Sequence, residues 1–227
     1  MAAFTAGLAC FQLSASAPAR SAVTTGAQSA VTPIAQSPAP LGERISEAAR
    51  ARTHHRVVYD PAYVSLAYPG GDVPPDRGVC ADVIVRALRG VELDLQVLIH
   101  EDMRAAFAAY PRIWGLQRPD RNIDHRRVPN IETFLTRIGA RLAASAAPVD
   151  YQAGDIVAWN LRGDAGSLPH IGIVTDRIGA SGWPMVVHNI GEGPREEDVL
   201  FSWPMTGHYR LTSDIAVAPA QSRAPAR

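Results

Sequence analysis

The chain has 227 residues, of which 47% are hydrophobic and 19% are charged, so it can form a globular core and is not an intrinsically disordered protein. Its 22 basic residues are all arginine and balance 22 acidic residues, so no overall charge favours nucleic acid or an anionic membrane as the main partner. Its only cysteines are Cys10 and Cys80, so we do not expect a disulfide framework.

Residues 1–44 are predicted to be an export-signal-like segment followed by a flexible linker. A short apolar run at residues 2–13 leads into a Ser/Ala/Pro stretch that resembles a signal cleavage context, and Ser37 begins a proline-containing linker. No basic residue precedes the run, so a disordered tail is the alternative, and Cys10 only partly fits a lipidation site. No apolar run reaches roughly eighteen residues. We therefore expect an exported, periplasmic or cell-envelope protein without a membrane span.

Helical patterns come first in the remaining chain. Residues 42–53 are compatible with a helix, and apolar residues recur at helical spacing over residues 91–110 and 131–142. Between the last two lies a stretch rich in Pro, Asp, Asn and Arg, residues 111–130, which predicts a long loop ending at Asn130 as a helix cap.

Residues 68–88 place Cys80 at the start of an amphipathic helix. A Gly/Pro-rich turn precedes the cysteine, and Asp76 is the expected N-cap. A thiol in the first turn of a helix lies near the positive end of the helix dipole, which favours the nucleophilic thiolate. The alternative is a buried core cysteine, because an apolar helical face usually packs inside.

The pattern changes to that of strands after residue 150. Residues 155–161, 170–175, 185–189 and 207–211 are apolar and separated by Gly, Asp and Pro turns. Helices followed by strands predict an α+β fold with N-terminal helices packed on a mostly antiparallel sheet. We expect one domain at residues 45–212 and a disordered tail at residues 213–227.

Two strand histidines can serve Cys80. A thiol hydrolase needs a base for the thiol proton and a group that orients the base. His170 begins one predicted strand and His188 ends the next, so antiparallel pairing would bring their rings together. Taken singly, each histidine fits a hydrogen-bonded, half-buried structural residue better than a catalytic one, and it is the joint pattern that favours catalysis.

The blocks GVCADVIVRAL, GDIVAWNL, PHIGIV and VVHNIG resemble the papain-like cysteine hydrolases of the bacterial cell wall, the NlpC-type peptidases and CHAP amidases. The resemblance implies a papain-like fold in which Cys80 is the nucleophile, His170 the base and His188 the orienting residue, with Asn189 as an alternative orienter. Tyr68 of YPGG resembles a tyrosine that shapes the substrate cleft in that superfamily. The residues flanking the cysteine, Val79 and Ala81, depart from its pattern, so oxyanion roles do not transfer there.

A closer resemblance, over roughly residues 59–210, is to the bacterial family catalogued as domain of unknown function 1287. It rests on the blocks YDP, YPGGDVP, GVC, HEDM, PDRNIDHRR, GDIVAW, HIGIV and HNIG. The family name carries no activity, so the mechanism rests on the residues themselves.

Further polar residues are candidates for substrate binding. Besides Tyr68 we assign this role to Asp82, Arg126 and Arg127, because paired arginines can bind a peptide carboxylate through two hydrogen bonds. A loop held by its own salt bridges is the alternative.

The sequence therefore predicts a thiol-dependent amide hydrolase acting on peptidoglycan or another amide substrate, with no cofactor and no metal. One alternative is a catalytically silent cell-wall binding module of the same fold. The other is a zinc hydrolase built from four histidines, His100, His125, His170 and His188, although no paired zinc motif supports it. The glycines follow no phosphate-binding pattern. The oligomeric state leaves no signal in the sequence.

Overall fold

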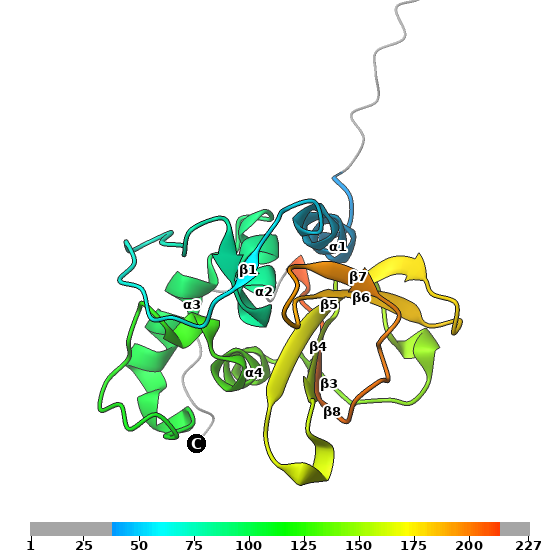
Figure 1. The fold of residues 1–227 in the computed structure, drawn as a ribbon. Coiled ribbons are helices and arrows are strands. Elements are labelled where there is room, and N and C mark those ends of the chain that lie inside the picture. The colour runs from blue at the N-terminus through cyan, green and yellow to red at the C-terminus, as the bar shows by residue number, and fades with distance from the viewer. Residues whose placement is uncertain (1–37, 214–227) are drawn as a thin grey trace, which may run out of the picture. The chain divides into compact units, whose positions relative to one another are not determined.

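The structure, a computed structural model, describes residues 38–213. Most of the predicted export segment, including Cys10, and the tail from residue 214 lie outside this part of the chain. The helices come first and the strands of the main sheet follow, which confirms the predicted α+β class (Figure 1). The helices are α1 (Leu41–Arg52), α2 (Cys80–Arg89), α3 (Leu95–Ala106) and α4 (Val128–Arg137). None of these described helices is long and apolar enough to cross a membrane.

The main sheet has six strands in the order β3-β8-β4-β5-β6-β7, and every neighbouring pair is antiparallel. Its members are β3 (Arg141–Leu142), β4 (Ile156–Asn160), β5 (Pro169–Ile178), β6 (Pro184–His188), β7 (Arg195–Glu197) and β8 (Met205–Tyr209). The four predicted strands correspond to β4, β5, β6 and β8. A separate parallel pair joins β1 (Val58–Tyr59) to β2 (Arg77–Gly78) just ahead of α2.

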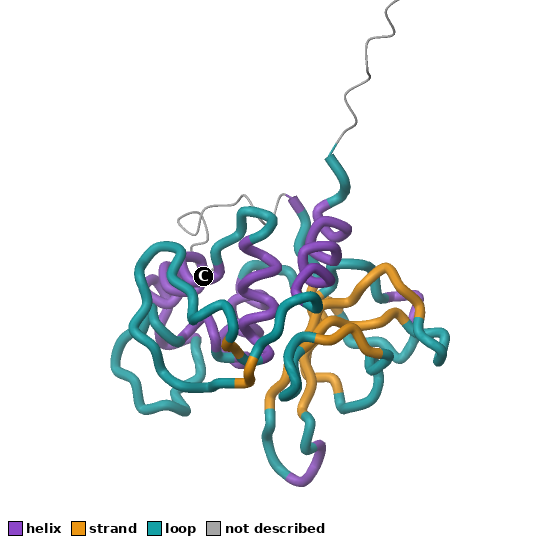
Figure 2. Tube along the Cα trace, turned by 45° about the horizontal axis from the view of Figure 1, so that its top comes forward, coloured by secondary structure: helices purple, strands orange, loops and turns teal. Residues whose placement is uncertain are grey.

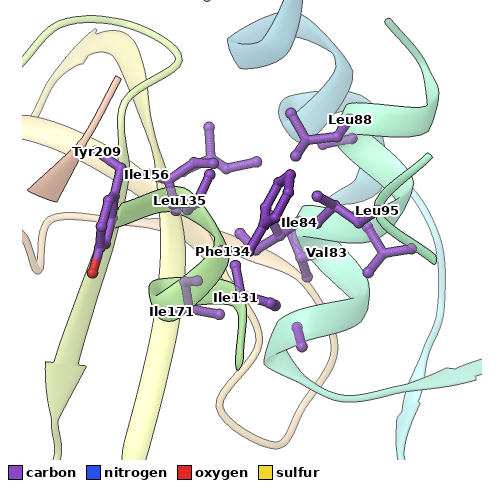
Figure 3. Close-up of a cluster of buried hydrophobic side chains, with 14 of the residues drawn as sticks. Val83, Ile84, Leu88, Leu95, Ile131, Phe134, Leu135, Ile156, Ile171 and Tyr209 are labelled. Carbon is purple, nitrogen blue, oxygen red and sulfur yellow. The ribbon is translucent and has the colours of Figure 1, made fainter. Parts of the chain in front are cut away.

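The helices lie to one side of the sheet, as the tube in Figure 2 shows. Between them lies the larger core, whose members include Ile84 and Leu88 of α2 and Ile171 of β5 (Figure 3). A smaller apolar cluster, including Trp159 and Val186, is built on the alternate residues of the same strands. Successive side chains of a strand point to opposite faces, so the apolar residues Ile171 and Ile173 pack toward the helices while His170 lies on the other face.

Two predicted helix caps, Asp76 and Asn130, are wrong. Helix α2 begins at Cys80 with Val79 as its N-cap, and the carboxylate of Asp82 accepts the Val79 N–H at 2.6 Å, so Asp76 has no capping role. Helix α4 begins at Val128, and Asn130 lies inside its first turn, where its Nδ2 donates to the Asp124 carbonyl at 3.2 Å. The long loop between α3 and α4 contains short 3-10 turns at η1 (Phe107–Ala109) and η2 (Asp124–Arg126). The carbonyl that Asn130 binds belongs to Asp124, the first residue of η2.

Candidate functional site

Cys80 is the first residue of α2, and its side chain is buried, with 5% of the residue exposed. Burial raises the pKa of the Cys80 thiol to about 11. Hydrogen bonding from the backbone N–H groups of Ala81 and Ile171 and from the Tyr59 hydroxyl opposes this shift. The helix N-terminus therefore does not produce a resting thiolate, contrary to the expectation from sequence, because loss of hydration outweighs the local donors.

Tyr59 is the tyrosine that lies beside the thiol. The parallel pairing of β1 with β2 sets Tyr59 opposite Gly78, two residues before the cysteine. Burial raises the pKa of Tyr59 to about 12, with the Cys80 charge as the next contribution, so its hydroxyl stays protonated and can donate at neutral pH. Sequence reasoning missed this residue. Its signal is weak, because a strand of two residues has no readable periodicity.

Tyr68, the predicted cleft tyrosine, lies elsewhere. Its hydroxyl donates to Glu101 of α3 at 2.9 Å, and its ring packs edge-on against His100 with centroids 5.3 Å apart. The side chain of Tyr68 is thus committed to the α3 surface. Its predicted role in substrate binding finds no support in these contacts, and Tyr59 occupies the position beside the nucleophile.

The rings of His170 and His188 meet, as the strand order predicted. His170 Nε2 lies 2.8 Å from His188 Nδ1, and both residues are buried. Burial, with a smaller contribution from His188, lowers the pKa of His170 to about 3, so its imidazole is neutral across the ordinary pH range. Ile171, whose N–H faces the Cys80 sulfur, directly follows His170 in β5. The nucleophile candidate and the base candidate therefore approach the same end of β5.

His188, rather than Asn189, is the partner of His170. The Asn189 side chain turns back on its own loop, where Oδ1 accepts the Gly191 N–H at 3.1 Å. On the far side of the His188 ring, Nε2 lies 2.8 Å from Oε2 of Glu197. Burial lowers the pKa of His188, while the Glu197 carboxylate acts in the opposite direction. His170, His188 and a carboxylate that the sequence did not indicate thus follow one another across the sheet.

Two tryptophans cover the histidine pair. Trp159 of β4 is paired directly with His170 across the sheet, and its ring stacks on the imidazole with centroids 5.8 Å apart. Trp203 lies edge-on to both histidines at 6.1 Å. The indole N–H of Trp159 donates to the Leu200 carbonyl at 3.0 Å, which holds this ring in place. Such an apolar cover removes water from the hydrogen bond between the imidazoles and accounts for the low pKa of His170.

Gly172 sets the spacing between the two strands that carry the histidines. A Cβ at this position would come within 2.6 Å of Cγ1 of Val186 and 3.2 Å of the His188 Cβ. We predict that Gly172→Ala lowers the free energy of unfolding by about 1–3 kcal/mol, the usual cost of overpacking. Urea unfolding measures the loss. In a Val186→Ala background, the Gly172→Ala change should cost less stability than it does in the unmodified protein. An unchanged unfolding midpoint for Gly172→Ala alone would contradict the prediction.

Asp82 and Arg126, two predicted substrate-binding residues, bind each other. Arg126 Nε and Nη2 donate to the Asp82 carboxylate at 2.8 and 2.9 Å, and the two side chains are 2% and 3% exposed. Asp82 also accepts the Val79 N–H described above. The charged groups of this pair are therefore fully committed, which contradicts their direct use in binding a substrate carboxylate. The pair instead anchors the start of α2 to the loop before α4.

Arg127 is placed differently from its neighbour. Its guanidinium stacks over Trp114 at 4.1 Å from the ring centroid and donates to Asp124 at 2.9 Å. A pocket of about 360 Å³ adjoins it, lined by Pro61, Tyr63, Val79, Ile123, Arg126 and Arg127. Val79 immediately precedes Cys80, so this pocket adjoins the start of α2. Substrate contact by Arg127 remains a prediction, now with a defined cavity.

The four histidines of the zinc alternative do not form one cluster. His125 is buried in η2, where burial lowers its pKa to about 4, and His100 packs on Tyr68. His170 and His188 lie on the sheet. Over residues 38–213, no group of three or more His, Cys, Asp or Glu side chains is arranged to hold a metal ion.

Comparison with known proteins gives one family and three similar proteins. Residues 46–211 match the family described as domain of unknown function (DUF1287). Over 166 residues, 73% of this chain and 80% of the relative, the sequence is 58% identical to the uncharacterized protein YijF of Escherichia coli (strain K12). Two solved structures from Trichomonas vaginalis are similar, NlpC1 with a TM-score of 0.43 and 16% identity and NlpC2 with 0.42 and 14%. The matches cover 77% and 79% of this chain but only 45% and 49% of those two chains.

Proposed function

The chain belongs to the DUF1287 family, and from this premise we propose that it is a thiol-dependent amide hydrolase, a peptidase or amidase, that acts on peptidoglycan in the cell envelope. One observation carries the proposal. The buried thiol of Cys80 lies against the backbone of β5 at the residue after His170, and His170 is hydrogen-bonded to His188 at 2.8 Å. A nucleophile, a base and an orienting group in this order are what acyl transfer requires.

In the proposed reaction, the Cys80 sulfur attacks the amide carbonyl carbon while its proton passes to Nδ1 of His170. The tetrahedral intermediate collapses, the C–N bond breaks, and the amine leaves with the proton from His170. A water molecule then attacks the thioester, again losing a proton to His170, and Cys80 leaves as the thiol. The net change is one amide and one water converted into an acid and an amine.

Two donors are suited to the negative oxygen of the intermediate. The first backbone N–H groups of a helix lack partners within the helix, and the Cys80 N–H at the start of α2 faces the Tyr59 hydroxyl oxygen, whose place an oxyanion would take. The Tyr59 hydroxyl is protonated at neutral pH and lies beside the sulfur. We assign the oxyanion site to these two groups. The substrate's acyl portion would extend toward the pocket beside Val79 and Arg127.

The test is release of fragments from purified sacculi, followed by mass spectrometry of the muropeptides. We expect the unmodified protein to release fragments and Cys80→Ala to release none, with the scissile bond read from the fragment masses. Asp176→Asn is the control, because Asp176 lies on β5, the strand that carries His170, but its side chain is 60% exposed and paired with Arg50. Equal release by Cys80→Ala would refute the nucleophile, and no release by the unmodified protein would refute the proposed substrate.

A second function is favoured by one observation, the burial of Cys80 with its raised pKa. A catalytically silent cell-wall binding module would keep such a cysteine as part of the core. In that case the protein would sediment with sacculi, and Cys80→Ala would bind them as tightly as the unmodified protein without any change in the muropeptides.

A further inference from the structure

Glu197 is an acidic residue that contacts the histidine pair. It belongs to β7, the edge strand of the sheet, where the register sets it opposite Val186, two residues from His188 on the same face of β6. Its Oε2 lies 2.8 Å from His188 Nε2. Among residues 38–213, His188 Nε2 makes no hydrogen bond of ordinary geometry, and the Glu197 carboxylate is the acidic group that it contacts. Among the described residues, the Glu197 carboxylate is therefore the group placed to accept a proton from His188 Nε2.

The arginines around Glu197 are engaged elsewhere. Arg195, which is paired with His188 across the strands, binds Glu192, and Arg177 binds Glu196. Within residues 38–213, His188 is the group that pairs with Glu197. The Glu197 side chain is 37% exposed, so one side of the carboxylate faces solvent while the other faces the imidazole.

A carboxylate has only acceptor sites, so its contact with His188 Nε2 favours the form in which this nitrogen carries a proton. A neutral His188 then has a lone pair at Nδ1, which accepts a hydrogen bond, and the proton between the two rings belongs to His170 Nε2. A neutral His170 protonated at Nε2 keeps its lone pair at Nδ1. That is the tautomer that can take a proton from a thiol.

Without the carboxylate the opposite arrangement is equally good for the ring pair. His188 would carry its proton at Nδ1 and donate it to His170 Nε2, and His170 would then be protonated at Nδ1. In this arrangement His170 has no lone pair available for the thiol proton. One carboxylate outside the predicted triad therefore decides between a competent base and an incompetent one.

We propose that Glu197 is a positioning residue that selects the tautomer of His188 and, through it, the tautomer of His170. The inference rests on the proposed function for its catalytic consequence, because the consequence requires His170 to be the base. The tautomers themselves exist whether or not the protein hydrolyses anything. The proposal thus has a readout that is separate from activity.

The test is NMR of protein labelled with ¹⁵N in histidine, which distinguishes a protonated from an unprotonated ring nitrogen. Spectra of His170→Gln and His188→Gln assign the two rings among the seven histidines of the chain. In the unmodified protein we expect both rings protonated at Nε2. In Glu197→Leu, which has no acceptor, we expect the Nδ1-protonated form of His170 to appear, and Glu197→Gln should retain part of the original state through its amide oxygen.

Glu196→Gln is the matched control. Glu196 is the neighbouring acid on β7, but its carboxylate binds Thr175 at 2.7 Å and Arg177 at 3.1 Å. We expect it to leave both tautomers unchanged. Thermal unfolding of each variant shows that the fold is kept. Identical histidine spectra for the unmodified protein and a folded Glu197→Leu variant would overturn the inference.

Activity measurements separate this inference from the proposed function. If sacculi are hydrolysed, Glu197→Leu should lower kcat about 10–100-fold with little change in KM, the size of effect typical for losing a carboxylate partner of a metal-bound histidine. A tautomer change without any hydrolysis would support the role of Glu197 while refuting the proposed function. Hydrolysis by the unmodified protein, with unchanged tautomers and unchanged kcat in Glu197→Leu, would support the proposed function and refute the role of Glu197.

Discussion

Replacing Asp82 with alanine is expected to lower the free energy of unfolding by about 3–5 kcal/mol, because it leaves the Arg126 guanidinium buried without a counter-charge. The side chains of both residues are almost fully inaccessible, and the bond between them is bidentate. The same substitution removes the acceptor for the Val79 N–H at the start of α2. Urea unfolding followed by tryptophan fluorescence measures the change.

The matched control is Asp72→Ala. Asp72 also pairs with an arginine, Arg86 at 2.8 Å, but its side chain is 31% exposed. Removing this exposed acid should cost only about 0–1 kcal/mol. The double variant Asp82→Leu/Arg126→Met removes both charges and should recover much of the loss, since apolar replacement of a whole buried pair is often close to neutral. If Asp82→Ala does not fold, Asp82→Asn serves the same comparison, and a loss below that of Asp72→Ala would contradict the prediction.

Cys80 is expected to react with iodoacetamide about 100-fold more slowly at pH 7 in the folded protein than in the urea-unfolded chain. The reactive species is the thiolate, and burial raises the pKa of this thiol from an ordinary 9.0 to about 11, so the thiolate fraction at pH 7 falls by two powers of ten. The alkylation rate should keep rising with pH up to about 11. Peptide mass spectrometry separates Cys80 from Cys10, which serves as the internal comparison.

This prediction distinguishes two forms of the resting site. Fast alkylation of Cys80 well below neutral pH would contradict it and would indicate a preformed thiolate. Slow alkylation would indicate a neutral thiol, and in the proposed mechanism its proton then passes to His170 only when substrate is bound. Transfer creates two opposite charges side by side, and their attraction offsets part of the cost that burial imposes on each charge alone. Tyr59→Phe should slow alkylation further, because the hydroxyl helps to stabilise the thiolate.

Much of the fold follows from local patterns. The helical spacing of apolar residues in α2, α3 and α4, and the apolar runs of β4, β5, β6 and β8, are strong signals because each covers a full turn or strand of core contacts. The strands β3 and β7 are two and three residues long, too short for a period. The caps at Asp76 and Asn130 were wrong because several polar residues precede each helix. Which of them reaches the first N–H depends on how the neighbouring loop folds back.

The site was predictable in its reactive groups and less so in their surroundings. Cys80, His170 and His188 stand in recognisable contexts, and the antiparallel order of β5 and β6 made the contact between the rings a consequence of adjacency. Asp82 and Arg126 were interpreted as substrate groups because their separation of 44 positions in the sequence conceals their pairing. Tyr59 and Glu197 were missed because each reaches the site through a strand of only two or three residues, which is too short to show a sequence pattern.

The sequence by itself determined which chemical groups this protein has, their order along the chain, its family and its α+β class. These depend on residue type and on spacing within single elements. Only the tertiary structure decided how those groups are protonated and which of them are free. Burial raises the pKa of Cys80 and lowers that of His170, Asp82 is neutralised by an arginine, and a carboxylate reaches His188. The reason is physical, because hydration and charge contacts depend on distances between residues far apart in the chain.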